Sequence, residues 1–278
     1  MNEQEILSGL KNDDSAVLRE AAFSAGSGKC KAAVPLLVKL LSSENLGVQE
    51  AAEYALRQIR GPEVVNELIP LLRSDEAPLR NMSMDVLREI GNDAIAPLKT
   101  LLVDEDPDIR IFISDILGST ANFDAMNALS EALLRDPEVN VRYQAAMSLG
   151  NLGFPEAANA LNQALADEEW VQFSVIESLT KIRSESSIMA LVKAMDKASD
   201  LVASMIIEAL GEFGNIKAVP LLTKKLSTTS GPLRNKIVKA IIQILNEKSL
   251  ALYLEKDKDT FRGYLLDALK DEDTAVQD

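Results

Sequence analysis

The sequence predicts an all-α solenoid built from about eight to nine antiparallel helix hairpins. Two short amphipathic runs separated by a turn recur along most of the 278 residues. The step Val141-Arg142 marks the second run of the clearest copy, and equivalent steps follow one another at 28 to 32 residues. A period near 31 residues is typical of helical-repeat solenoids. One hairpin of this size cannot bury its own apolar stripe, so neighbouring copies must cover it.

The clearest copy, residues 124–154, shows how each hairpin is encoded. Its first run places Met126, Leu129 and Leu133 on one side of a helix, because they lie three and four residues apart. Asp136-Pro137 ends this helix, since proline lacks an amide proton and disfavours helical geometry in the residue before it. The second run is expected to bury its own apolar face, formed by Val141, Ala145, Leu149 and Leu152.

The same pattern divides the whole chain into hairpins without a flexible linker between them. We therefore expect residues 1–278 to form one continuous array. The expected hairpins are residues 2–31, 33–61, 62–92, 93–123, 124–154, 155–184, 185–215 and 216–247, followed by a degenerate pair over 248–278.

The segment DPEVNVRYQAAMSLGNLG, residues 136–153, resembles the bacterial HEAT-like repeat of the phycobilisome-lyase (PBS lyase) type. The pairs Pro35-Leu36, Pro97-Leu98 and Pro220-Leu221 match the first helix of that repeat. We call the second residue of the Val141-Arg142 step, and its equivalent in each copy, the anchor residue. It is glutamine in place of arginine at 49 and 172, and alanine at 203. The resemblance covers roughly residues 1 to 270. It implies a right-handed superhelix whose second helices line a concave surface, and it says little about function because such repeats serve many unrelated partners.

Positions on the second helices that point away from the core are candidates for binding. Counted from the anchor residue as zero, positions −1, +3, +7 and +10 face the core, so +1 and +5 lie on the opposite side and +2 near its edge. The middle hairpins place aromatic and apolar residues there, with carboxylates around them. The candidate partner-binding residues on the concave face are Ile111, Phe112, Asp115, Tyr143, Met147, Trp170, Phe173, Glu177, Met205 and Glu208.

Exposed aromatic residues ringed by polar groups mark protein-binding surfaces, so these positions favour a protein-interaction scaffold. The acidic residues favour a partner that carries basic residues around an apolar ridge, such as one helix lying along the groove. The alternative is that Phe112 and Phe173 turn inward, and that Met205 packs between hairpins. The anchor arginines have a structural interpretation, a ladder of arginine–carboxylate pairs between successive turns, involving Arg19, Arg80, Arg110, Arg142 and Arg234.

Composition narrows the class of protein further. The net charge of −14 disfavours binding to nucleic acid or to anionic membranes. The acidic start of the chain is unlike a signal peptide, and no apolar run approaches the roughly 20 residues that span a bilayer. A single cysteine, Cys30, cannot form an internal disulfide. We expect a cytoplasmic protein of undetermined oligomeric state, and the role of the basic segment 216–262 stays open.

The chain contains no histidine. This removes histidine-dependent nucleophilic catalysis and histidine metal sites, including the iron site of the metal-dependent hydroxylases built from HEAT-like repeats, which bind iron through His-Glu pairs. No phosphate-binding glycine motif is present either. We therefore expect no enzymatic activity, no cofactor and no metal. Two other functions stay open: an accessory subunit of a bilin lyase or related chromophore-handling complex, and a nucleic-acid binder acting through Lys224, Lys225, Lys236 and Lys239.

Overall fold

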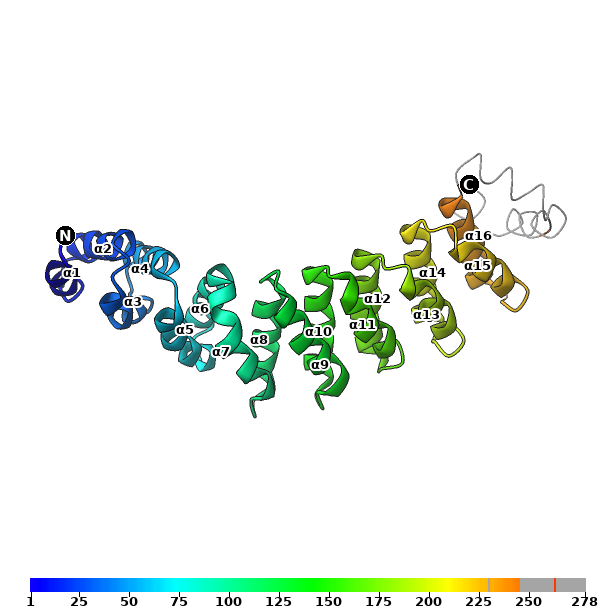
Figure 1. The fold of residues 1–278 in the computed structure, drawn as a ribbon, viewed down its shortest axis with the longest axis horizontal. Coiled ribbons are helices and arrows are strands. Elements are labelled where there is room, and N and C mark those ends of the chain that lie inside the picture. The colour runs from blue at the N-terminus through cyan, green and yellow to red at the C-terminus, as the bar shows by residue number, and fades with distance from the viewer. Residues whose placement is uncertain (230, 246–262, 264–278) are drawn as a thin grey trace. The chain divides into compact units, whose positions relative to one another are not determined.

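The computed structural model describes residues 1–229, 231–245 and 263. Within this part of the chain the fold is all-α, with sixteen α-helices and no strand (Figure 1). The expected all-α class is confirmed there, whereas the degenerate pair at 248–278 lies outside the described residues. The chain divides into two compact units, Met1–Leu129 (unit 1) and Ser130–Asp278 (unit 2). The expected continuity of the array across this division stays a prediction.

Unit 1 holds four helix hairpins, and each second helix follows its first after a short turn. Three short 3-10 segments, η1 (Lys31–Ala33), η2 (Ile69–Arg73) and η3 (Leu101–Val103), precede or extend first helices. The hairpins are α1 (Glu3–Gly9) with α2 (Ser15–Ser27), α3 (Val34–Leu40) with α4 (Leu46–Ile59), α5 (Pro62–Leu68) with α6 (Ala77–Ile90), and α7 (Asn92–Thr100) with α8 (Pro107–Gly118). The division between the units falls within α9 (Phe123–Arg135).

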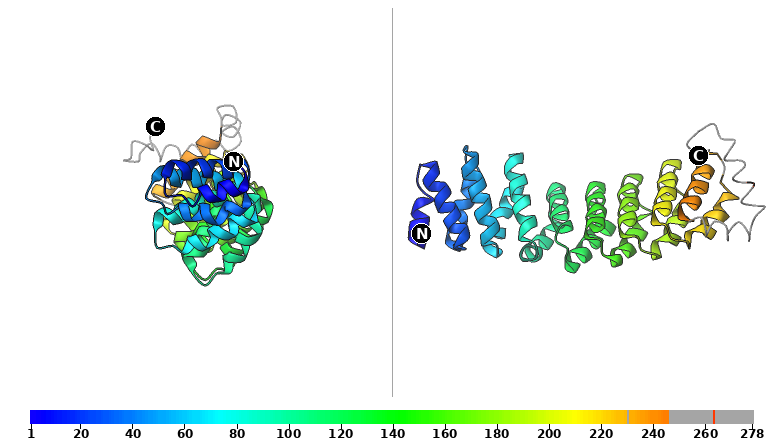
Figure 2. Two further views of the ribbon diagram at one scale, coloured as in Figure 1. Left: turned by 90° about the vertical axis from the view of Figure 1, so that its left-hand side faces the viewer. Right: turned by 90° about the horizontal axis from the view of Figure 1, so that it is seen from above.

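Unit 2 continues the alternation of first and second helices. After α10 (Val139–Leu152) and the short segment η4 (Pro155–Ala157), its remaining described hairpins are α11 (Ala158–Ala164) with α12 (Glu169–Ile182), α13 (Ser186–Ala194) with α14 (Asp200–Phe213), and α15 (Ala218–Leu226) with α16 (Pro232–Ile244). Within each unit, second helices pack side by side, α2 on α4 in unit 1 and α10, α12, α14 and α16 in series in unit 2 (Figure 2). No helix in the described ranges is long and apolar enough to cross a membrane.

The buried stripe of the second helices follows the pattern expected from the sequence. The residue seven positions after each anchor is fully buried in every hairpin from the second to the eighth: Leu56, Leu87, Leu117, Leu149, Leu179, Leu210 and Ile241. In α10, a small residue, Gly150, follows Leu149 of this buried stripe. Gly150 of α10 lies against Ser178 of α12, whose hydroxyl donates a 2.8 Å hydrogen bond to the Ala146 carbonyl oxygen. The second helices therefore approach each other closely at this point.

The anchor side chains hold their own hairpin turns. Arg142 Nη1 donates to the carbonyl oxygens of Asp136 (3.0 Å) and Pro137 (3.2 Å). Arg80 and Arg110 make the same kind of contact to Ser74 (2.6 Å) and Asp104 (2.7 Å). Where glutamine replaces arginine, it also donates hydrogen bonds to carbonyl oxygens near the turn. The Nε2 atoms of Gln49 and Gln172 donate to the carbonyl oxygens of Leu41 and Leu165, both at 3.1 Å.

Within the described residues, the expected pairing of an anchor arginine with a carboxylate of the next turn is found at Arg142, whereas Arg80 binds the carbonyl oxygen of its own turn instead. Arg142 reaches the next turn with two 2.9 Å hydrogen bonds to Asp167 and a 3.1 Å contact to Glu168. The hydrogen bonds with Asp167 raise the pKa of Arg142 above its ordinary value, although partial burial opposes the shift.

We expect Arg142→Ala to lower the free energy of unfolding by about 2 kcal/mol, because it leaves Asp167 and the turn carbonyl groups without their charged donor. Arg142→Gln is the matched variant: it copies the residue found at 49 and 172 and retains the carbonyl contacts. It should recover about half of the loss. Urea denaturation followed by circular dichroism measures both, and equal losses for the two variants would show that the turn contacts contribute nothing.

The second helices of several hairpins end on a residue with positive φ. Gly153 and Gly214 occupy this left-handed position with φ of 70° and 63°, but Arg183 adopts it with φ of 53°. A left-handed conformation costs an L-residue about 1 kcal/mol or more, whereas glycine adopts it freely. We expect Arg183→Gly to raise the free energy of unfolding by about 0.5 kcal/mol, after allowing for the greater entropy of glycine in the unfolded chain. Gly153→Ala is the reciprocal control and should destabilise in the same urea denaturation.

Candidate partner-binding face

Three aromatic rings from neighbouring second helices gather in unit 2. Trp170, in the first turn of α12, stacks on Tyr143 of α10, with the ring centroids 4.8 Å apart and the planes inclined by 14°. Phe173, one turn further along α12, meets the tryptophan edge to face at 6.3 Å and 78°. Trp170 is 51% exposed, while Tyr143 and Phe173 are half-buried. We call Tyr143, Trp170 and Phe173 the aromatic cluster.

The sequence left open whether aromatic residues at these positions face outward or pack between hairpins. In the structure the rings of the aromatic cluster do both. The rings bridge α10 and α12, so they contribute to the contact between repeats. They also leave part of their surface, above all the tryptophan, open to solvent. Met147 lies one turn beyond Tyr143 and is half-buried. Exposed aromatic area of this kind, on a rigid pair of helices, is suited to bury an apolar side chain of another protein.

Carboxylates lie on both sides of the rings along α12. Glu169 and Glu177 lie four residues before and after Phe173, so they share its side of the helix. Glu169 accepts a hydrogen bond from the hydroxyl of Ser199, and Glu177 pairs with Lys181 at 2.9 Å. On α14, Met205 is half-buried and Glu208 is exposed, with Lys236 of α16 2.5 Å from the Glu208 carboxylate.

The remaining sequence-predicted residues belong to unit 1. Ile111 and Phe112 of α8 are half-buried, and the guanidinium carbon of Arg80 lies 5.6 Å from the centroid of the Phe112 ring. Asp115 accepts a hydrogen bond from Arg88 of α6. A cation from the preceding repeat thus covers the aromatic ring in this hairpin.

The acidic residues that frame the predicted face are not bare carboxylates. Asp115, Glu177 and Glu208 each pair with an arginine or lysine of the same or a neighbouring second helix. These pairs are half-exposed or exposed, and exposed ion pairs contribute little to stability. The three carboxylates expected to form an acidic rim therefore lie in ion pairs within the chain.

Sequence reasoning missed a second aromatic pair, in unit 1. Phe23 of α2 and Tyr54 of α4 are 48% and 43% exposed, with ring centroids 5.4 Å apart and planes inclined by 56°. Tyr54 occupies an outward position of the repeat, but Phe23 is shifted by one residue from it, so the repeat register did not select Phe23. Contact between neighbouring second helices brings the two rings together.

The basic residues of the eighth hairpin reach back to the seventh. Lys217 pairs with Glu185, Lys225 with Asp196, and Lys236 with Glu208. Their partners lie 28 to 32 residues earlier, which is one repeat. These lysines therefore link consecutive hairpins, and their charge is partly neutralised.

The pattern that defines HEAT repeats matches residues 3–88 and 126–204, which is more than half of the chain. This chain belongs to the HEAT-repeat family. Deoxyhypusine hydroxylase of Arabidopsis thaliana is similar to this HEAT-repeat chain. The two are 26% identical over 214 residues, which are 75% of this chain and 68% of the relative. Deoxyhypusine hydroxylase-B of Oryza sativa subsp. japonica is 33% identical over 132 residues, which are 46% of this chain and 43% of the relative.

Solved structures with the same fold include Kap121p, with a TM-score of 0.64 and 13% identity over 99% of this chain and 36% of that protein. Yeast importin-beta (Kap95p) gives a TM-score of 0.55 at 14% identity, over 98% of this chain and 45% of that one. At these identities the likeness shows the fold alone. It supports a HEAT-repeat solenoid, a fold typical of protein-binding scaffolds.

The residues present do not fit the iron site that HEAT-like hydroxylases build from His-Glu pairs. The chain has no histidine to supply the nitrogen ligands. In the described ranges, no three carboxylate or cysteine side chains come together in a way that would hold a metal ion. Cys30 is buried. The described residues therefore do not fit an iron site of that kind.

Proposed function

We propose that this HEAT-repeat protein is a non-enzymatic scaffold that binds another protein through the outward face of its second helices. The stack of Trp170 on Tyr143 carries the proposal. It presents a half-exposed tryptophan on two rigid helices, with Phe173 beside it. Tryptophan and tyrosine are enriched among the residues that dominate binding energy at protein interfaces.

The surroundings of the aromatic cluster favour a partner with basic residues around an apolar ridge. Glu169 and Glu177 flank the rings on α12, and Glu168 is exposed beside them. The electron-rich faces of aromatic rings attract lysine and arginine. Arg80 over Phe112 in unit 1 shows that a guanidinium fits against a ring on this side of the second helices. Among the described residues, no such cation lies over the rings of the aromatic cluster, so a partner can supply it.

The charge of the chain and the pairing of its lysines disfavour nucleic acid as a partner. Three lysines of the eighth hairpin pair with carboxylates of the seventh, and the chain carries a net charge of −14. Phosphate binding needs free cations, because much of its affinity comes from the release of condensed counterions. A cytoplasmic location and the absence of a cofactor are part of the same proposal.

The resemblance to the phycobilisome-lyase repeat type suggests an alternative, an accessory subunit of a bilin lyase or a related chromophore-handling complex. Mixing the protein with free bilin and recording the absorbance spectrum separates the two functions. A shifted bilin spectrum would favour the alternative, and an unchanged spectrum favours the scaffold.

Co-purification from the native cell tests the scaffold directly. The protein should retain a defined partner, and a variant carrying Tyr143→Ala and Trp170→Ala should lose it while keeping its helical circular dichroism. Retention of the same partner by the double variant would contradict the proposal.

A further inference from the structure

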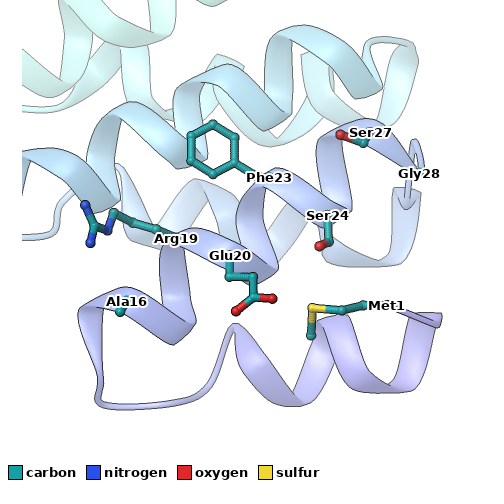
Figure 3. A pocket seen from close by; sticks show the side chains of 8 residues that line it. All are labelled: Met1, Ala16, Arg19, Glu20, Phe23, Ser24, Ser27 and Gly28. Atoms are coloured by element: carbon teal, nitrogen blue, oxygen red, sulfur yellow. The ribbon is translucent and has the colours of Figure 1, made fainter.

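The aromatic pair of unit 1 lies beside a surface pocket of about 680 Å³ that no sequence pattern selected. Phe23 and Ser24 of α2 line it, together with Met1, Arg19 and Glu20 (Figure 3). Phe23 and Met1 are 48% and 54% exposed, so the pocket has apolar walls that remain open to solvent. Tyr54 of α4 extends the apolar surface beyond Phe23.

Two carboxylates lie close to the aromatic pair along α2 and α4. Glu20 and Glu50 are exposed, and their carboxylates have no partner among the described residues. In the view of Figure 3, the Glu20 carboxylate lies on the same side of the pocket as Met1, and the Arg19 guanidinium points away from both. The Arg19 side chain extends toward Gly47 of α4, and its Nε donates a 3.3 Å hydrogen bond to the Ser15 carbonyl oxygen.

This surface repeats the chemistry of the aromatic cluster in unit 2. In each case, two rings from neighbouring second helices meet, and a carboxylate lies one turn before a ring on the same helix. Glu20 precedes Phe23 by three residues, and Glu50 precedes Tyr54 by four, which is also the spacing of Glu169 and Phe173. Residues at these spacings are neighbours on a helix surface. A basic segment bound there would have aromatic rings and carboxylates within reach, because Phe23 and Glu20 both line the pocket.

We propose that Phe23, Tyr54, Glu20 and Glu50 form a second docking site, in unit 1, for a basic segment of the partner. The inference rests on the proposed function for its choice of occupant, since it assigns both units the same kind of ligand. Charge complementarity supports this occupant, because Glu20 and Glu50 have no cationic partner among the described residues. Arg80 over Phe112 shows that a guanidinium fits against a ring in this unit.

The probe is a short peptide with blocked termini that alternates arginine with leucine, and the control peptide carries glutamate in place of arginine. Isothermal titration calorimetry of the full chain should give two equivalents of the arginine peptide and no heat with the control. The variant carrying Phe23→Ala and Tyr54→Ala should bind one equivalent. Glu20→Gln should weaken one of the two sites about threefold.

Fluorescence separates this site from the proposed function, because Trp170 is the single tryptophan of the chain and reports on unit 2 alone. Its emission should titrate equally in the full chain and in the Phe23→Ala, Tyr54→Ala variant. One equivalent in the full chain with a tryptophan response would overturn the second site and leave the first. One equivalent lost in the variant, without a tryptophan response, would support the second site and overturn the first. Absence of any binding would overturn both.

Discussion

Replacing Gly150 with alanine is expected to lower the free energy of unfolding by about 2 kcal/mol. In an ordinary helix the same change stabilises by about 1 kcal/mol, because alanine is the better helix former. Here the added methyl group would lie 2.5 Å from Ser178 Oγ and 2.9 Å from Ser178 Cα. Relief requires α12 to move away from α10, which also strains the hydrogen bond from Ser178 to Ala146. The packing cost therefore exceeds the gain in helix propensity.

Asn151→Ala is the matched control, one residue along the same helix and exposed. It should leave stability unchanged or raise it slightly, by at most about 0.5 kcal/mol. Urea denaturation followed by circular dichroism gives the overall change, and the emission of Trp170 reports unit 2 directly. A Gly150→Ala variant as stable as the unaltered protein would show that the second helices are not packed as closely as the structure indicates.

Truncating Tyr143 and Trp170 of the aromatic cluster should have the largest effect on function. Residues of this kind at the centre of an interface cost about 2 kcal/mol or more when truncated to alanine. Tyr143→Ala with Trp170→Ala should therefore weaken partner binding at least about 100-fold. The effect on folding should be smaller, because Trp170 is half-exposed and the core stripe beneath it stays intact. Calorimetry with the co-purified partner measures the affinity, and circular dichroism measures helical content.

Met189→Ala is the control for nonspecific loss of apolar surface. Met189 is 48% exposed and lies on α13, a first helix, in the same unit. The partner's affinity should be unchanged in this variant. Equal weakening by Met189→Ala and by the double variant would place the binding surface elsewhere.

The repeat pattern predicted the helices well because it is set by burial. Leu149 and its equivalents recur every repeat and are fully buried, so periodicity alone locates the second helices and their inner side. The turn within a hairpin could also be predicted from the sequence, because Asp136-Pro137 separates α9 from α10 as expected. These features depend on local sequence and on one repeated contact.

Contacts specific to one pair of hairpins were less predictable. The anchor arginines were expected to bind carboxylates, but Arg80 binds a carbonyl group, which every turn supplies irrespective of its side chains. The stack of Tyr143 and Trp170 depends on how two helices of different repeats are placed, and no spacing within either helix encodes it. Phe23 was not predicted for the same reason, because its contact with Tyr54 depends on how two helices of different repeats are placed. The two residues lie 31 positions apart in the sequence.

We expect the aromatic cluster to be open to solvent in the free protein and covered by the partner in the complex. Acrylamide quenching of Trp170 fluorescence tests it most directly, because no other tryptophan contributes. We expect efficient quenching of the free protein and several-fold weaker quenching once the partner is bound. Quenching that is unchanged on saturation with the partner would contradict the claim.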